Sequence, residues 1–329
     1  MKISYPAYYK TFKCIASACP DSCCHEWIVD VDEDAAKLYR SLSGDLGDRL
    51  RQVLTEDNTM ELEHNRCPMW RADGLCRIQA ELGHDALCKT CREFPRLTHD
   101  YGDFVEYGLE LSCPEAARMI FSCDQKLISE EHPGECAPEY DSELMAILKK
   151  SRHTALNFLD NTSLPLNRAL AALLLYGHTV QGAIDGEGSI DFDEAECLAL
   201  GDQFAGSGDL TALVEFFENL ELLTDRWPSL LKTASPRPIT NALKPLAIYM
   251  IQRYWLQAVS DYDLISRVKL TVSACILVAA LGGSVEAAQL FSKEIENNAD
   301  NIDAILDGAY TSPALTDANL LGLMRRFAI

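Results

Sequence analysis

Residues 14–24 have the sequence Cys-Ile-Ala-Ser-Ala-Cys-Pro-Asp-Ser-Cys-Cys, which places four thiols within one short segment. Thiolates separated by a few residues can turn toward one metal ion or cluster, because a short loop directs their sulfurs to the same side. Further cysteines follow at Cys67, Cys76, Cys88, Cys91 and Cys113. Two such groups can complete one coordination sphere, so the sequence predicts that the first part of the chain binds a metal through these nine cysteines.

Cys23 and Cys24 are adjacent, and the side chains of neighbouring residues diverge on a helix or a strand. One mononuclear ion therefore rarely takes both thiols, and the pair is easier to reconcile with an iron–sulfur cluster, or with two centres, than with one zinc finger. The spacing as a whole leaves zinc and iron–sulfur equally open. Neither the two-cluster ferredoxin run nor the two-Cys, two-His finger spacing is present.

The remaining cysteines are isolated, and we expect them to be packing residues because free cysteine is among the most buried residue types. They are Cys123, Cys136, Cys197 and Cys275. His25 and His64 stand close to the cysteine groups, but a lone histidine is more often solvated or supports a ligand from behind. Both histidines are therefore left out of the predicted ligand set.

The chain has 329 residues, which favours about two domains. Of its 13 cysteines, 11 lie at or before Cys136. Prolines and a glycine mark a boundary at residues 132–138. We expect a cysteine-rich metal-binding or iron–sulfur domain over residues 1–136, and a helical domain over residues 137–329 that forms a substrate cleft or packs against the first.

The predicted fold class is mainly α, with a small β-hairpin in the cysteine-rich region. Residues 97–112 alternate like a hairpin around a turn at 100–103, and Gly83 ends a short helix over residues 74–82. Other helices are predicted at 32–42, 45–54 and 114–121, and then at 140–160, 165–182, 191–204, 209–223, 240–259, 262–281, 284–297 and 314–327. The apolar run at 270–283 is too short to span a membrane, so we interpret it as a buried core helix.

Charge excludes several classes of partner. Asp and Glu number 50 against 29 Lys and Arg, a net charge of −21. A general nucleic-acid binder needs a basic face, and an anionic membrane would repel this chain. The first ten residues lack the apolar segment of a secretory signal, so we expect a cytoplasmic protein. Thiols stay reduced in that compartment, which favours metal binding over disulfides.

No dinucleotide-binding glycine motif, P-loop or nucleophile elbow is present, and the three-cysteine motif of radical S-adenosylmethionine enzymes is absent. Arg92 and Arg96 flank Pro95 beside the Cys88 and Cys91 pair. A guanidinium fork suits a carboxylate or a phosphate, although pairing with Glu93 or Glu110 is an equal alternative.

At these residues the chain resembles the flagellin lysine-N-methylase family of bacteria. The resemblance is carried by residues 12–27, 74–83, 87–96 and 111–118. A broader group of small cysteine-rich proteins, described as zinc or iron chelators, shares part of the cysteine pattern. The resemblance implies an enzyme that methylates lysines of flagellin, with a [4Fe–4S] cluster and S-adenosylmethionine as methyl donor. The nine grouped cysteines are the positions to which the family's cysteines carry over.

On this hypothesis Arg92 and Arg96 bind the carboxylate of the donor, and Glu93 or Glu110 removes a proton from the lysine nucleophile. The acidic surface would attract a lysine-bearing substrate. The alternative is a non-enzymatic module in which the cysteines bind structural zinc for protein interaction, or a metal-trafficking protein.

Overall fold

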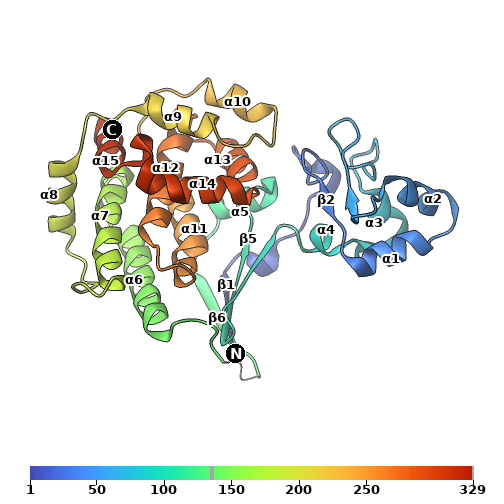
Figure 1. Cartoon of the computed structure of the whole chain (residues 1–329), viewed down its shortest axis with the longest axis horizontal. Coiled ribbons are helices and arrows are strands. Elements are labelled where there is room, and N and C mark those ends of the chain that lie inside the picture. Colours follow the sequence, from blue (N-terminus) through green and yellow to red (C-terminus); the bar gives the residue numbers. More distant parts are fainter. Residues whose placement is uncertain (134–136, 328–329) are drawn as a thin grey trace.

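A computed structural model describes residues 1–133 and 137–327. It has a large helical body and a smaller lobe, and strands lie between the two (Figure 1). The lobe is made of residues between the first strand and a later hairpin, so the chain leaves the body early and returns to it.

The sheet has four strands in the order β4-β5-β1-β6. Their bounds are β1 Lys2–Pro6, β4 Arg96–Asp100, β5 Phe104–Leu109 and β6 Leu127–Glu131. Strands β4 and β5 are antiparallel and joined by a turn in which Gly102 has φ +87°, so the predicted hairpin is confirmed. Strand β1 is parallel to β5, with Ile3 opposite Val105, and antiparallel to β6. The hairpin is thus half of a larger sheet that the sequence did not reveal.

The smaller lobe holds the helices α1 Glu33–Ser41, α2 Gly44–Val53, α3 Arg77–Leu82 and α4 Lys89–Glu93, with the two-residue strands β2 Val29–Asp30 and β3 Thr59–Met60. Asp32 caps α1 by accepting a hydrogen bond from the Ala35 backbone N–H at 3.1 Å. Gly83, at φ +91°, ends α3 as expected. A compact hydrophobic cluster around Tyr39 and Leu50 fills the lobe.

The body holds α5 Pro114–Ser122 and the later helices: α6 Ser142–Asn161, α7 Leu166–Ile184, α8 Glu194–Phe204, α9 Leu210–Glu218, α10 Arg226–Leu231, α11 Lys244–Tyr254, α12 Ile265–Ala280, α13 Val285–Phe291, α14 Ala299–Thr311 and α15 Asp317–Arg326. The mainly α fold class is confirmed. Every residue of α12 is buried, which agrees with the core helix expected at 270–283. Among the described residues, no helix is long and apolar enough to cross a membrane.

The body differs from prediction in three places. Helices α10 and α14 were not predicted, and the helix expected at 284–297 is α13 followed by a π-helical turn, Ser292–Glu296. A π turn inserts one extra residue per hydrogen bond and often occurs at functional sites. This turn faces the lobe and carries Lys293 and Asn297 to the cavity described below.

The larger hydrophobic cluster extends from the helices of the body into the sheet, where it includes Phe104 and Leu109. The smaller cluster runs from Val29 to Cys88. Residues 134–136, where we placed the domain boundary, and Cys136 itself lie outside the described residues. The division at 136 and 137 stays a prediction, although hydrophobic packing groups the sheet with the later helices.

Candidate functional site

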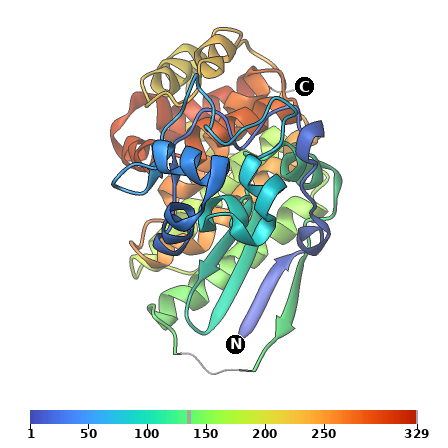
Figure 2. The ribbon, with the colours of Figure 1, turned by 90° about the vertical axis from the view of Figure 1, so that its right-hand side faces the viewer.

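The sheet topology brings three cysteine-bearing segments to the same end of the strands. Strands β1 and β5 are parallel, so both end at the same side of the sheet, and β4 begins there because Arg96 pairs with Leu109. At this end of the strands, Cys14 lies after β1, Cys91 lies before β4 and Cys113 lies after β5. Figure 2 shows the blue strand β1 beside the teal strands of the hairpin, so segments that are far apart in sequence start from neighbouring strands.

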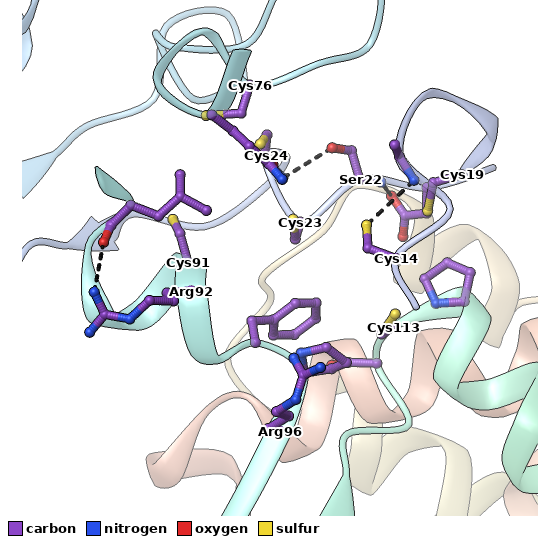
Figure 3. A pocket seen from close by; sticks show the side chains of 18 of the residues that line it. Cys14, Cys19, Ser22, Cys23, Cys24, Cys76, Cys91, Arg92, Arg96 and Cys113 are labelled. Atoms are coloured by element: carbon purple, nitrogen blue, oxygen red, sulfur yellow. Dashed lines mark hydrogen bonds between the residues drawn. The ribbon is translucent and has the colours of Figure 1, made fainter. Parts of the chain in front are cut away.

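A cavity of about 440 Å³ lies between the lobe and the body. Seven of the nine predicted cysteines line it: Cys14, Cys19, Cys23, Cys24, Cys76, Cys91 and Cys113. Figure 3 shows Cys14, Cys19 and Cys113 along one side of the cavity and Cys24, Cys76 and Cys91 along the other, with Cys23 between them. The volume lies within the range typical of small-molecule and cofactor sites.

The other two predicted cysteines, Cys67 and Cys88, are buried behind the cavity wall. The Cys67 N–H donates a hydrogen bond to the Cys24 carbonyl at 2.7 Å, and Cys88 is the N-cap residue of α4, which carries Cys91. Each of these buried cysteines is thus held by the backbone next to one that faces the cavity. Within the described residues, no three Cys, His, Asp or Glu side chains already surround a single ion position.

The thiols in the cavity differ in acidity. The neighbouring Cys23 and Cys67 thiols lower the pKa of the Cys24 thiol, whereas the Cys24 thiol and burial raise the pKa values of Cys23 and Cys67. Burial raises the pKa of Cys113 to about 11, although the backbone N–H groups of Ala116 and Glu115 oppose that shift. One thiolate among neighbouring thiols is thus favoured over several, because the thiols that surround it stay protonated.

Arg92 and Arg96 both line the cavity, as the predicted role requires. Arg92 donates a hydrogen bond to the Leu87 carbonyl at 3.2 Å, and the Arg96 guanidinium lies 5.4 Å from the ring centre of Phe12. Among the described residues neither guanidinium forms an ion pair with a carboxylate. Both are therefore available to an anionic ligand.

The two predicted general bases, Glu93 and Glu110, do not line the cavity. Glu93 is exposed and Glu110 lies beside the cavity, but neither is among the lining residues. Burial raises the pKa of Glu110, and Ser112 donates a hydrogen bond to it at 3.2 Å. A raised pKa suits a general base, but the position of Glu110 gives it no direct access to the cavity, so its role stays a prediction.

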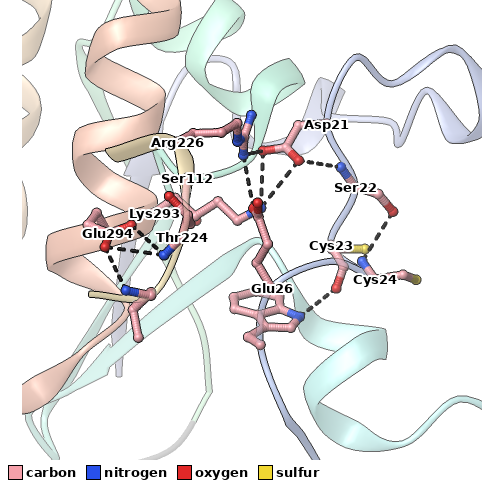
Figure 4. Close-up of polar contacts among 12 residues, drawn as sticks. Asp21, Ser22, Cys23, Cys24, Glu26, Ser112, Thr224, Arg226, Lys293 and Glu294 are labelled. Atoms are coloured by element: carbon pink, nitrogen blue, oxygen red, sulfur yellow. Dashed lines mark hydrogen bonds and ion pairs between the residues drawn. The ribbon is translucent and has the colours of Figure 1, made fainter. Parts of the chain in front are cut away.

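A charged cluster that the sequence did not predict closes one side of the cavity (Figure 4). The Lys293 ammonium lies 3.1 Å from Asp21 and 2.8 Å from Glu26, and Arg226 lies 2.9 Å and 3.0 Å from the same carboxylates. Burial opposes ionisation of Asp21, but the Lys293 charge and the Arg226 hydrogen bond outweigh it and lower the pKa of Asp21. Gln289 donates to Asp21 at 3.2 Å and to the Ser112 carbonyl at 2.6 Å.

This charged cluster fixes the first cysteine segment to the helical body. Asp21 lies between Cys19 and Cys23, and the sequence identified it only as one residue of the cysteine motif. Lys293 and Gln289 are about 270 residues away, and no local sequence pattern indicates that they contact Asp21. Asn297 follows the same π turn and lines the cavity, and its buried Nδ2 has no hydrogen-bond partner among the described residues.

Aromatic side chains supply the apolar part of the cavity wall. Phe12, Trp27 and Phe94 line it, and the rings of Trp27 and Phe94 meet edge to face at 5.1 Å. Trp27 is held in place because its Nε1 donates to the Cys23 carbonyl at 2.5 Å. This wall suits an alkyl chain or a cationic group.

Of the isolated cysteines, Cys197 and Cys275 are buried, as expected for packing residues, whereas Cys123 is exposed. His25 packs edge to face against Trp70 at 5.1 Å and does not line the cavity.

Part of this chain is similar in sequence to known proteins. It is 33% identical to the flagellar biosynthetic protein FliU of Salmonella muenchen over 134 residues, which cover 36% of this chain and 77% of that protein. It is also 32% identical over 144 residues to the lysine-N-methylases of Salmonella typhimurium and Salmonella choleraesuis. The chain belongs to the FliB-like lysine-N-methylase family.

The family resemblance inferred from the cysteine motifs is thereby confirmed. The match covers 39% of this chain and 35% of each lysine-N-methylase, so it spans about a third of the length of those two proteins. No family model and no solved structure matches the chain.

Proposed function

We propose that the chain is a protein-lysine N-methyltransferase that acts on flagellin, uses S-adenosylmethionine as methyl donor and holds an iron–sulfur cluster at the cysteine-lined cavity. The observation that carries the proposal is that seven thiols line the same cavity as two guanidinium groups that have no acidic partner among the described residues. The names of the relatives support the activity and its connection with flagella.

The donor set fits an iron–sulfur cluster. Such clusters are held by cysteine thiolates, and here the thiols are spread along a cavity wall. A single zinc ion instead needs four donors at 2.0–2.3 Å from one point, and the described residues offer no position with even three. A bound cluster with an open iron site would supply Lewis-acid or electron-transfer chemistry to the donor.

The protein's own groups would bind and orient the two substrates. Arg92 and Arg96 offer a bidentate fork for the donor's carboxylate. The aromatic wall that includes Trp27 would hold the aliphatic stem of the target lysine. The neutral amine of that lysine then takes the methyl group, and S-adenosylhomocysteine leaves.

The amine must lose its proton before this transfer, and the cavity places limits on the acceptor. Asp21 lines the cavity, but its ion pairs and lowered pKa make it a weak base at neutral pH. Glu110 has a raised pKa but does not face the cavity. We therefore propose that water in the cavity takes the proton first. Glu110 or the exposed Glu93, the two bases suggested by the sequence, would then accept it.

The test is methyl transfer by anaerobically purified protein. Flagellin and methyl-labelled S-adenosylmethionine are incubated with the chain, and methyl-lysine is mapped by mass spectrometry. We expect label on flagellin lysines, and a loss of at least tenfold in turnover for Arg96→Gln. Cys123→Ser, whose thiol is exposed and lies outside the cavity, is the matched control and should keep full turnover.

Two results would overturn the proposal. One is a protein that contains its full metal complement and binds flagellin, yet transfers no label. The other is equal turnover in wild type and Arg96→Gln at donor concentrations below saturation, because removal of one guanidinium that binds the carboxylate must weaken donor binding.

A further inference from the structure

The π-helical turn Ser292–Glu296 brings Lys293 to the cavity, together with Asn297, which follows it. Lys293 is engaged by Asp21 and Glu26. Asn297 differs, because its Nδ2 is buried and has no hydrogen-bond partner among the described residues. Of the described residues that line the cavity, it alone has such an atom. A buried donor without a partner costs free energy, so this amide favours a ligand that supplies an acceptor.

A buried ion pair fixes the end of this turn. Glu296, which directly precedes Asn297, has no exposed side-chain surface, and its carboxylate lies 3.4 Å from the Arg253 guanidinium. The Tyr254 hydroxyl donates to the same carboxylate at 2.9 Å, and the Tyr249 hydroxyl does so at 3.3 Å. All three partners belong to α11. A buried pair persists only when further hydrogen bonds support it, and here they hold the backbone beside Asn297 in place.

The same buried network reaches a second segment of the cavity wall. The Leu111 backbone N–H donates to the Tyr249 hydroxyl at 3.3 Å. Ser112 and Cys113, which follow Leu111, both line the cavity. One network therefore fixes the turn before Asn297 and the segment before α5 relative to each other.

The local charge decides which part of a ligand Asn297 suits. The charged cluster that contains Lys293 is balanced, because its two cations pair with its two carboxylates (Figure 4). Arg92 and Arg96, by contrast, form no ion pair among the described residues, and they reach the cavity from α4 and β4. A carboxylate therefore gains most at the two arginines, and a neutral polar group gains most at Asn297.

The chemistry of the amide narrows the choice further. Asparagine presents a donor and an acceptor side by side. Adenine presents the complementary pair, its N6 amine beside a ring nitrogen, and asparagine binds that edge with two hydrogen bonds in protein–DNA complexes. Gln79, the other amide side chain of the cavity lining, belongs to an exposed residue, so a ligand there mainly replaces water. The neutral heterocycle of an adenine nucleoside thus fits Asn297.

We propose that Asn297 binds the adenine of S-adenosylmethionine, and that the Glu296 ion pair sets its position. This inference rests on the proposed function, which supplies the methyl donor. The donor is then held at both ends: the arginines of α4 and β4 bind its carboxylate, and the helical body binds its adenine.

The experiment measures ligand binding to the full chain, purified without oxygen, and leaves methyl transfer aside. The ligands are S-adenosylhomocysteine and two probes for its halves, adenosine and methionine, and calorimetric titration gives the Kd of each. The variants are Asn297→Ala, Asn297→Leu and Arg96→Gln. Leucine fills the space of the asparagine without polar atoms. Asn157→Ala, on α6 at an exposed position outside the cavity, is the matched control.

We expect both Asn297 variants to bind adenosine and S-adenosylhomocysteine about threefold to tenfold more weakly, the effect of one lost hydrogen bond, and to bind methionine normally. Arg96→Gln should do the reverse for the two halves, and Asn157→Ala should bind all three ligands like the wild type. If adenosine alone binds too weakly to be measured, S-adenosylhomocysteine against methionine gives the same comparison.

Equal binding of S-adenosylhomocysteine and adenosine by the wild type and both Asn297 variants would overturn this inference and leave the proposed function standing. An equal loss for adenosine and methionine would also overturn it, because a merely structural role affects both halves. A wild-type protein that binds no S-adenosylhomocysteine would remove the donor from the proposed function and this inference with it. The expected pattern in a protein that methylates nothing would overturn only the proposed methyl transfer.

Discussion

Replacement of Lys293 by methionine should detach the first cysteine segment from the body. Lys293 is 8% exposed, and its partners Asp21 and Glu26 are 9% and 11% exposed, so the charges are largely out of water. Breaking a buried ion pair from one side costs about 3–5 kcal/mol, because a charge stays buried without compensation. Arg226 still contacts both carboxylates, so we expect the lower end, about 3 kcal/mol.

Arg226 provides the matched control. It contacts the same two carboxylates but is 45% exposed, so solvent screens its charge and Arg226→Met should cost at most about 1 kcal/mol. The triple variant Asp21→Asn, Glu26→Gln, Lys293→Met removes all three buried charges together. It should recover most of the lost stability, because neutral replacement of a whole buried pair is often tolerated.

The assay is urea unfolding at neutral pH followed by circular dichroism, with limited proteolysis of the native protein to detect cleavage near residues 14–30. We expect Lys293→Met to lower the unfolding midpoint and speed cleavage in that segment. Equal effects of Lys293→Met and Arg226→Met, or a triple variant no more stable than Lys293→Met, would refute the reasoning that buried charge governs this contact.

Three further predictions concern substrate binding and pH. Trp27→Ala should raise KM for flagellin about tenfold with a smaller change in kcat, since it removes one aromatic face worth about 1–1.5 kcal/mol; an unchanged KM would exclude this wall from substrate binding. Raising the salt from about 50 to 500 mM should raise KM several-fold, because the net charge of −21 attracts a lysine-bearing substrate; a flat salt series would contradict that role. Burial lowers the pKa of His99 from 6.5 to about 4, so the unfolded state binds a proton first and stability should fall as pH drops from about 6.5 to 4. Because the buried Nε2 of His99 has no hydrogen-bond partner among the described residues, His99→Phe should flatten that pH dependence, which urea midpoints across the range would measure.

Local signals predicted the features that depend on neighbouring residues. The helix that starts near Asp32, the stop at Gly83 and the turn around Gly102 each follow from a few adjacent residues, and the structure has all three. The cysteine spacing likewise identified thiols of which seven share a cavity. These predictions succeeded because short loops and turns are determined by residues that are close in sequence.

The parts that sequence reasoning missed depend on distant contacts. Strand β1 is five residues long and ends in Pro6, and its parallel partner β5 lies about 100 residues later. No local periodicity therefore predicts that the two strands pair. Lys293 shows the same limit, because a buried lysine resembles a surface lysine in sequence. Glu93 is different: it follows Arg92 on α4, where successive side chains turn by about 100°, so Arg92 reaches the cavity and Glu93 faces solvent.

The position of the lobe in the chain explains how its cysteines reach the cavity. Residues between Cys24 and Cys91 form a unit inserted between β1 and β4, and both of its ends open on the cavity. An inserted unit with a small core can shift against its host unless its ends are fixed. At its first end, the Asp21 and Lys293 ion pair anchors the adjoining segment to the body. At its second end, β4 pairs with β5, so the sheet fixes the segment that follows Cys91. The thiols of the cavity therefore lie between two anchored segments, which keeps their positions relative to the body although the lobe has a small core of its own.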